Sequence, residues 1–169
     1  MSHPYFGHYP EQVQQQVESL LQQQRLGQFF IKRYPHSHDI KTDKQLYNYI
    51  ERLRQEYMKN SPRVHQAAYV KRHNMALNAL GTHTYKTTQH GGRHKTSHQI
   101  HIEATLRHAP EPILRALVVH ELAHFKEKHH NKAFYNLCQH MEPHYHQLEL
   151  ELRLFLLLCE SEGNIYLPD

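Results

Sequence analysis

Tryptophan is absent from this chain of 169 residues, and cysteine, aspartate and long apolar runs are scarce. Two cysteines, Cys138 and Cys159, are too few for a disulfide framework or a zinc site built from several cysteines. The scarcity of aspartate argues against sites made of paired aspartates. The longest apolar run covers only residues 154–159, whereas a helix that crosses a bilayer requires ~20 apolar residues. We therefore expect no membrane partner.

The charge of the chain is mildly basic. Lys and Arg number 20 against 16 Asp and Glu, which gives a formal net charge of +4 and a pI near 9.0. This excess permits an anionic partner, but it is far from the dense basic stripe of a dedicated nucleic-acid-binding protein. The first residues lack the basic stretch and apolar run of a secretory signal. We therefore expect a cytoplasmic protein without dedicated nucleic-acid binding.

The apolar periodicity of the first sixty residues predicts helices. Val13, Val17 and Leu21 recur at helical spacing, and Gly27 is expected to cap the end of that helix. Residues 42–45 form a capping-box pattern that opens a second helix, which ends near residues 60–62.

The rest of the chain predicts a small sheet followed by helices. Strand patterns occur at 66–71, 82–87 and 99–103, with a Gly-Gly turn between the last two. Helices are expected over 109–128, 132–141 and 144–160. This order predicts a single-domain α+β fold, in which residues 1–60 are an N-terminal helical segment. The small sheet should be mostly antiparallel and should pack on the helix over 109–128.

The strongest chemical pattern is His120-Glu121-Leu122-Ala123-His124, an HExxH motif. Two histidines four residues apart project from one side of a helix and can share a zinc ion. The glutamate is rotated by about 100° and can take a proton from a water on the metal. Because 19 of the 169 residues are His, chance produces the motif in roughly one of six shuffled chains. The alternative is a buried helix whose two histidines bond only to backbone or carboxylate groups.

A third ligand would complete a hydrolytic zinc site and leave one position for water. His130 can reach the metal only if the chain turns after about Lys126, and the polar stretch 126–131 permits such a turn. His129 is the rival, one residue earlier. A scheme of two histidines and a downstream glutamate has three further candidates: Glu142, Glu149 and Glu151.

Residues 118–135, VVHELAHFKEKHHNKAFY, resemble the signature of the YgjP-like metallopeptidase family. That signature is HELxH, five residues, a histidine, and an aromatic residue four positions on, here Phe134. The resemblance implies a zincin-like, minimal gluzincin-like fold, with residues 61–169 as the metallopeptidase domain. It implies three metal ligands and one catalytic glutamate, namely His120, His124, His130 and Glu121. The Trp-Gly-Ser-Cys-like stretch of many members is missing from this chain.

We therefore expect a zinc-dependent hydrolase, since imidazole ligands in a tetrahedral site suit zinc. The first expectation is a metallopeptidase with a narrow peptide substrate. The alternative is a pyrophosphohydrolase of nucleoside triphosphates, because a metal-activated water attacks phosphorus as readily as carbon. Basic residues near the turn would then hold phosphates, namely Lys71, Arg72, Lys86, Arg93, His94 and Lys95. A non-enzymatic metal-binding module is the third hypothesis.

Overall fold

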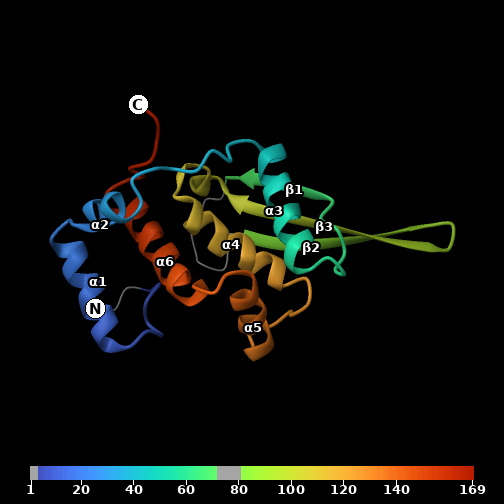
Figure 1. Ribbon diagram of the computed structural model, residues 1–169, viewed down its shortest axis with the longest axis horizontal. Coiled ribbons are helices and arrows are strands. Elements are labelled where there is room, and N and C mark those ends of the chain that lie inside the picture. Colours follow the sequence, from blue (N-terminus) through green and yellow to red (C-terminus); the bar gives the residue numbers. More distant parts are fainter. Residues whose placement is uncertain (1–3, 72–80) are drawn as a thin grey trace.

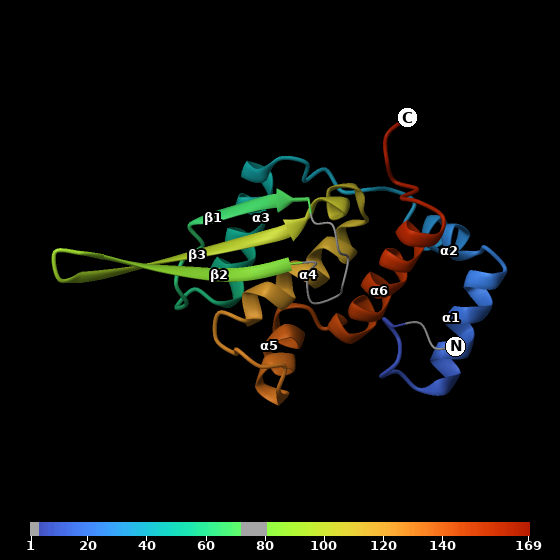
Figure 2. The same ribbon diagram turned by 180° about the vertical axis from the view of Figure 1, so that it is seen from behind.

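The computed structural model describes residues 4–71 and 81–169, and at 81–90 and 93–95 it describes the backbone alone. The described residues form a three-stranded sheet, one face of which is covered by α3 (Asp43–Tyr57) and α4 (Glu111–Ala123) (Figures 1 and 2). On the other side of α4 lies α6 (Tyr145–Ser161), which packs against it. Helices and a small sheet therefore share one core, and the α+β class is confirmed.

The remaining helices surround this centre. At the outer side of α6 lie α1 (Glu11–Gln22) and α2 (Leu26–Arg33), and α5 (Lys132–Met141) lies beyond the C-terminal end of α4. A short 3-10 helix, η2 (Ala104–His108), leads from the sheet into α4 and was not predicted. None of the helices formed by the described residues has the length and apolar character needed to cross a bilayer.

The sheet has the order β1-β3-β2, with β1 at Gln66–Val70, β2 at Gly81–His90 and β3 at Arg93–Glu103. Strands β2 and β3 are antiparallel, and the turn between them contains Gly91 (φ 54°) and Gly92 (φ 79°). Two successive residues with positive φ match the right-handed twist of a tight hairpin, and only glycine adopts that conformation without strain.

The prediction of a mostly antiparallel sheet is wrong for β1, which pairs in parallel with β3. A two-residue turn forces β2 and β3 to run in opposite directions, whereas the longer connection after β1 imposes no such constraint. The alternation expected at 99–103 is confirmed, because Ile100 and Ile102 are buried in the core shared with α4.

The N-terminal helices test the capping predictions. The capping box of α3 is confirmed, since the Thr42 hydroxyl accepts from the Gln45 backbone N–H and the Gln45 side chain accepts from the Thr42 N–H. The expected cap at Gly27 is wrong, because Gly27 lies inside α2. Its backbone N–H donates to Glu162 Oε2 at 3.2 Å, and a Cβ at this position would lie equally close to that oxygen. Close approach, rather than helix termination, requires this glycine.

The buried imidazole of His38 gives the fold a pH dependence. Its Nδ1 accepts from the Ile40 N–H at 3.0 Å and its Nε2 lies 2.8 Å from the Leu106 carbonyl oxygen. Because a carbonyl oxygen only accepts, Nε2 carries the proton and the ring is neutral. Burial lowers the pKa of His38 below its ordinary value of 6.5.

The unfolded chain therefore binds a proton at His38 below about pH 6.5 that the folded chain does not, so stability falls as the pH drops through this range. Urea unfolding between about pH 7.5 and 5.5 should show a larger loss of unfolding free energy in the wild type than in His38→Gln. Equal pH dependence in the two proteins would contradict a neutral, buried His38.

Candidate metal centre

The HExxH motif lies at the C-terminal end of α4, which ends at Ala123 rather than near residue 128. The chain turns at once, since Phe125 N donates to the Leu122 carbonyl oxygen and both Lys126 N and Glu127 N donate to that of Ala123. It then reaches Asn131, whose side chain accepts from Phe134 N and caps α5, as predicted. This early turn brings residue 130 back to the end of α4.

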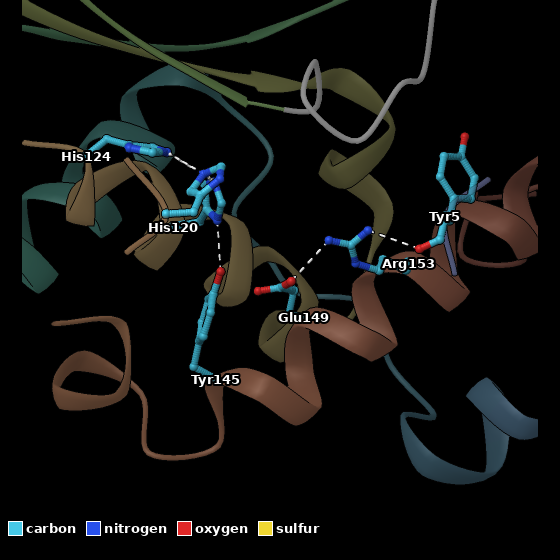
Figure 3. A network of polar contacts seen from close by, with 7 residues as sticks. Tyr5, His120, His124, Tyr145, Glu149 and Arg153 are labelled. Carbon is cyan, nitrogen blue, oxygen red and sulfur yellow. Dashed lines mark hydrogen bonds and ion pairs between the residues drawn. The ribbon is translucent and has the colours of Figure 1, made fainter. Parts of the chain in front are cut away.

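His120, His124 and His130 converge through their Nε2 atoms. Figure 3 shows the first two of them at the end of α4. The Nε2 of His120 lies 3.2 Å from that of His124 and 3.2 Å from that of His130, and the remaining distance is 3.1 Å. Tetrahedral bonds of ~2.1 Å to one metal ion separate two imidazole nitrogens by ~3.4 Å. The donor type and spacing therefore fit one metal ion bound by three imidazoles.

The three imidazole rings are held in this arrangement by a buried aromatic ring, and two of them also by hydrogen bonds at their Nδ1 atoms. Phe134 of α5 is fully buried, and its ring centroid lies 4.8–4.9 Å from those of all three histidines. The Nδ1 of His124 donates to the Glu127 carbonyl oxygen at 2.9 Å, so its Nε2 carries a lone pair in the neutral ring. The Nδ1 of His120 lies 2.8 Å from the Tyr145 hydroxyl.

The environment of His120 and His130 favours the neutral imidazole, the form that binds metal ions. Burial lowers the pKa of His120 to about 3, with further contributions from the neighbouring His124 and His130 and from Arg153. Burial also lowers the pKa of His130, although this residue lies at the surface. The alternative, in which the histidines bond only to backbone or carboxylate groups, would not bring their Nε2 atoms together. Here the three Nε2 atoms face one point.

The rival ligands lie elsewhere. His129 is exposed and is not part of the histidine group. The three downstream glutamates are each held by arginine: Glu142 by Arg115 at 2.7 Å, Glu149 by Arg153 at 3.1 Å, and Glu151 by Arg33. Within residues 4–71 and 81–169, the three histidines are the group whose ligand atoms lie close enough to hold a metal ion.

The sequence did not predict a chain of polar contacts that runs from His120 through Tyr145, Glu149 and Arg153 to Tyr5 (Figure 3). Tyr145 is the first residue of α6 and is buried, and its pKa is raised by burial and by the nearby Glu149 carboxylate. One turn further along α6, Glu149 accepts from Arg153, whose other nitrogen donates to the Tyr5 carbonyl oxygen at 3.1 Å. No local pattern links Tyr145 to His120, because the contact spans 25 residues.

Glu121 lies beside His120 in the last turn of α4, and its side chain is only 4% exposed. A carboxylate is rarely buried to this extent without a structural or chemical requirement. Of the basic residues expected to hold phosphates, Arg72 lies outside the described residues, as do the side chains of Lys86, Arg93, His94 and Lys95.

The Tyr145 hydroxyl should raise the metal affinity of the site. Groups that orient a ligating imidazole typically contribute about 10–100-fold to metal affinity. Tyr145→Phe keeps the buried ring and removes only the hydroxyl. We expect zinc affinity to fall by about 10-fold or more, measured by competition with a chromophoric chelator. Tyr135→Phe, on a ring whose centroid lies 6.3 Å from that of Tyr145, is the matched control. Equal affinities in both variants would remove Tyr145 from the site.

Comparison with known proteins identifies the class. The model of the family described as "YgjP-like, metallopeptidase domain" matches residues 2–154, and the chain therefore belongs to the YgjP-like family. A protein of Escherichia coli (strain K12), UTP pyrophosphatase, is 49% identical over 152 residues, which cover 90% of this chain and 91% of that protein. No solved structure matches the chain.

The expectation of a peptide substrate is corrected by this relative. Both names describe hydrolases, so the hydrolase class is supported, but the name of the relative gives a nucleotide as its substrate. The physical reason for the error is that HExxH defines how a metal and a water are held. The same activated water attacks a carbonyl carbon or a phosphorus, and the motif carries no information about which one is presented.

Proposed function

We propose that this protein is a metal-dependent pyrophosphohydrolase of nucleoside triphosphates, with UTP as the first substrate to test. The observation that carries the proposal is the 49% identity to UTP pyrophosphatase over 90% of the chain. The three convergent histidines support it, because they supply a metal site of the kind that hydrolytic chemistry uses.

In this proposal His120, His124 and His130 hold a zinc ion through their Nε2 atoms. Zinc is favoured because three neutral imidazoles at tetrahedral spacing suit it. When bound, zinc supplies Lewis-acid chemistry, lowering the pKa of a water and withdrawing charge from a phosphoryl oxygen. Tyr145 and the Glu127 carbonyl fix the two rings on the HExxH motif by bonding to their Nδ1 atoms.

Glu121 is proposed as the general base. Its carboxylate takes a proton from the attacking water, whose oxygen forms a bond to the α-phosphorus of the nucleotide. The bond from that phosphorus to the α,β-bridging oxygen breaks, and pyrophosphate leaves with its electron pair. The proton held by Glu121 is then available to the phosphate products, so UTP and water give UMP and pyrophosphate.

We also propose that the scaffold is a minimal zincin-like one and that residues 1–60 and 61–169 form one unit around it. The position of β3 beside α4, and the return of His130 after the turn, support the first part. Contacts between α2 and α6 support the second, since Phe30 packs edge-on against Phe155 at 5.8 Å.

The test is hydrolysis of UTP by purified, metal-analysed protein, with UMP and pyrophosphate measured separately. We expect release of both products, loss of activity after chelation, and recovery on addition of zinc. UDP, other nucleoside triphosphates and an unstructured polypeptide are assayed in parallel. Turnover of the polypeptide without turnover of any nucleotide would overturn the proposal. Full nucleotide turnover by protein from which chelation has removed all metal would also overturn it.

A further inference from the structure

The hairpin of β2 and β3 extends well beyond the rest of the sheet. Strand β1 pairs with β3 only from Gln99 to Glu103, so residues 85–98 form a two-stranded ribbon without a third strand. Figures 1 and 2 show this ribbon, here called the arm, projecting away from α5 and α6. Its length is about 20 Å at ~3.4 Å per residue. The arm is continuous with the sheet at its base, and beyond residue 99 no third strand of the described residues pairs with it, which leaves its strand edges open to a partner.

The arm and the stretch of sequence before it are rich in cations and poor in acids. Residues 57–102 contain seven of the 20 Lys and Arg residues and none of the 16 acidic ones. The arm itself, YKTTQHGGRHKTSH, has three cations, three histidines and no acid. The modest net charge of +4, which led us to expect no dedicated nucleic-acid binding, is an average that hides this distribution.

The strand register gathers the three cations on one face. Lys86 pairs with Ser97, Thr88 with Lys95 and His90 with Arg93, and these alternate pairs share a face of an antiparallel ribbon. The same face continues into the sheet at Gln66 and His101. The opposite face continues into Ile100 and Ile102, which are buried beneath the helices. The sheet face opposite α3 and α4 has no helix of the described residues over it (Figure 2), and by register it is the face to which Lys86, Arg93 and Lys95 belong.

We propose that the arm is a docking surface for duplex DNA, bound through its phosphates without sequence preference. A two-stranded β-ribbon fits the major groove of B-form DNA, whereas the major groove of A-form RNA is too deep and narrow. Sheets that bind single strands present aromatic residues for stacking, and the cationic face has no Phe, Tyr or Trp. The arm has no apolar residue except Tyr85, which excludes insertion into a lipid surface. The base of the arm lies close to the candidate metal centre, since the His98 ring stacks on that of Phe125 at 5.0 Å, and the arm projects from there beyond the helices (Figure 1).

The test is the salt dependence of binding between full-length protein and a short duplex DNA, followed by fluorescence anisotropy. Each phosphate contact contributes about −0.9 to the slope of log K against log salt. The variant Lys86→Gln/Arg93→Gln/Lys95→Gln should therefore have a slope smaller in magnitude by about 2.7 than the wild type. The matched control Arg25→Gln/Lys32→Gln/Lys44→Gln removes the same charge from exposed positions on α1–α3 and their connections, and should retain the wild-type slope.

Several outcomes would overturn the proposal. Equal loss in both triple variants would mean that only net charge matters. Tighter binding to duplex RNA or to anionic vesicles than to DNA would assign the arm to another partner, and an increase in the KM for UTP would assign it to the substrate. Lys95→Gln alone, with an expected change in slope of about 0.9, keeps the test decisive if the triple variant does not fold. The wild-type protein's activity on UTP is a separate measurement, so failure of one proposal leaves the other intact.

Discussion

Glu121→Gln should lose UTP hydrolysis while keeping its metal. The amide has nearly the same shape as the carboxylate, so it fits the same buried position at the end of α4. It has no basic oxygen that can take a proton from water, and removal of a general base costs about 10²–10⁴-fold in turnover. The measurements are kcat for UTP and zinc content by elemental analysis, on the same preparation.

Glu127→Gln is the matched control for this substitution. Glu127 lies three residues after the motif, but its contact with His124 is made by the backbone carbonyl and does not depend on the side chain. We expect turnover and zinc content to stay near those of the wild type. Full activity in Glu121→Gln would mean that the glutamate is not the base. Loss of zinc in Glu121→Gln would instead make it part of the structure of the metal centre.

His130→Ala should weaken zinc binding far more than the same change one residue earlier. The Nε2 of His130 lies 3.1–3.2 Å from the other two Nε2 atoms, whereas His129 is exposed and outside the group. Groups that only orient a ligand contribute about 10–100-fold to metal affinity. Loss of a ligand itself should therefore lower the zinc affinity by more than about 100-fold. Competition titration against a chelator of known affinity measures the dissociation constants.

His129→Ala is the control, because it removes the same side chain from the same exposed turn. Its affinity for zinc should equal that of the wild type. If His129→Ala loses zinc and His130→Ala retains it, the turn after α4 is arranged differently in solution. If neither variant loses zinc, the third ligand is a carboxylate, and Glu149 is the first to test because it lies in the polar chain behind His120.

Local patterns in the sequence predicted local structure well. The capping residues Thr42 and Asn131 specify helix starts through hydrogen bonds to residues three positions on, and both predictions are confirmed. The errors occur where distant residues decide. Gly27 lies close to Glu162, 135 residues away, and the direction of β1 depends on its pairing with β3. Neither contact leaves a signal in the neighbouring residues.

The candidate site was predictable where its residues are close in sequence. His120, His124 and His130 lie within one helix end and one turn, so spacing and family resemblance were enough to name them as candidates. Tyr145 and Arg153 come from α6 and reach the site only through the packing of α6 on α4. The substrate was mispredicted because HExxH describes the attacking water, while the group that is attacked depends on surfaces outside the motif.

The short span of the three histidines also affects how metal and folding are coupled. Residues 120–130 close two small loops around a metal ion, and closing small loops costs little entropy. The unfolded chain can therefore bind zinc through the same segment, and its other histidines add further sites. A ligand that binds the unfolded state stabilises the fold by less than its affinity for the native site implies. Refolding from denaturant should accordingly proceed best without metal, with zinc added once α6 has brought Tyr145 against His120.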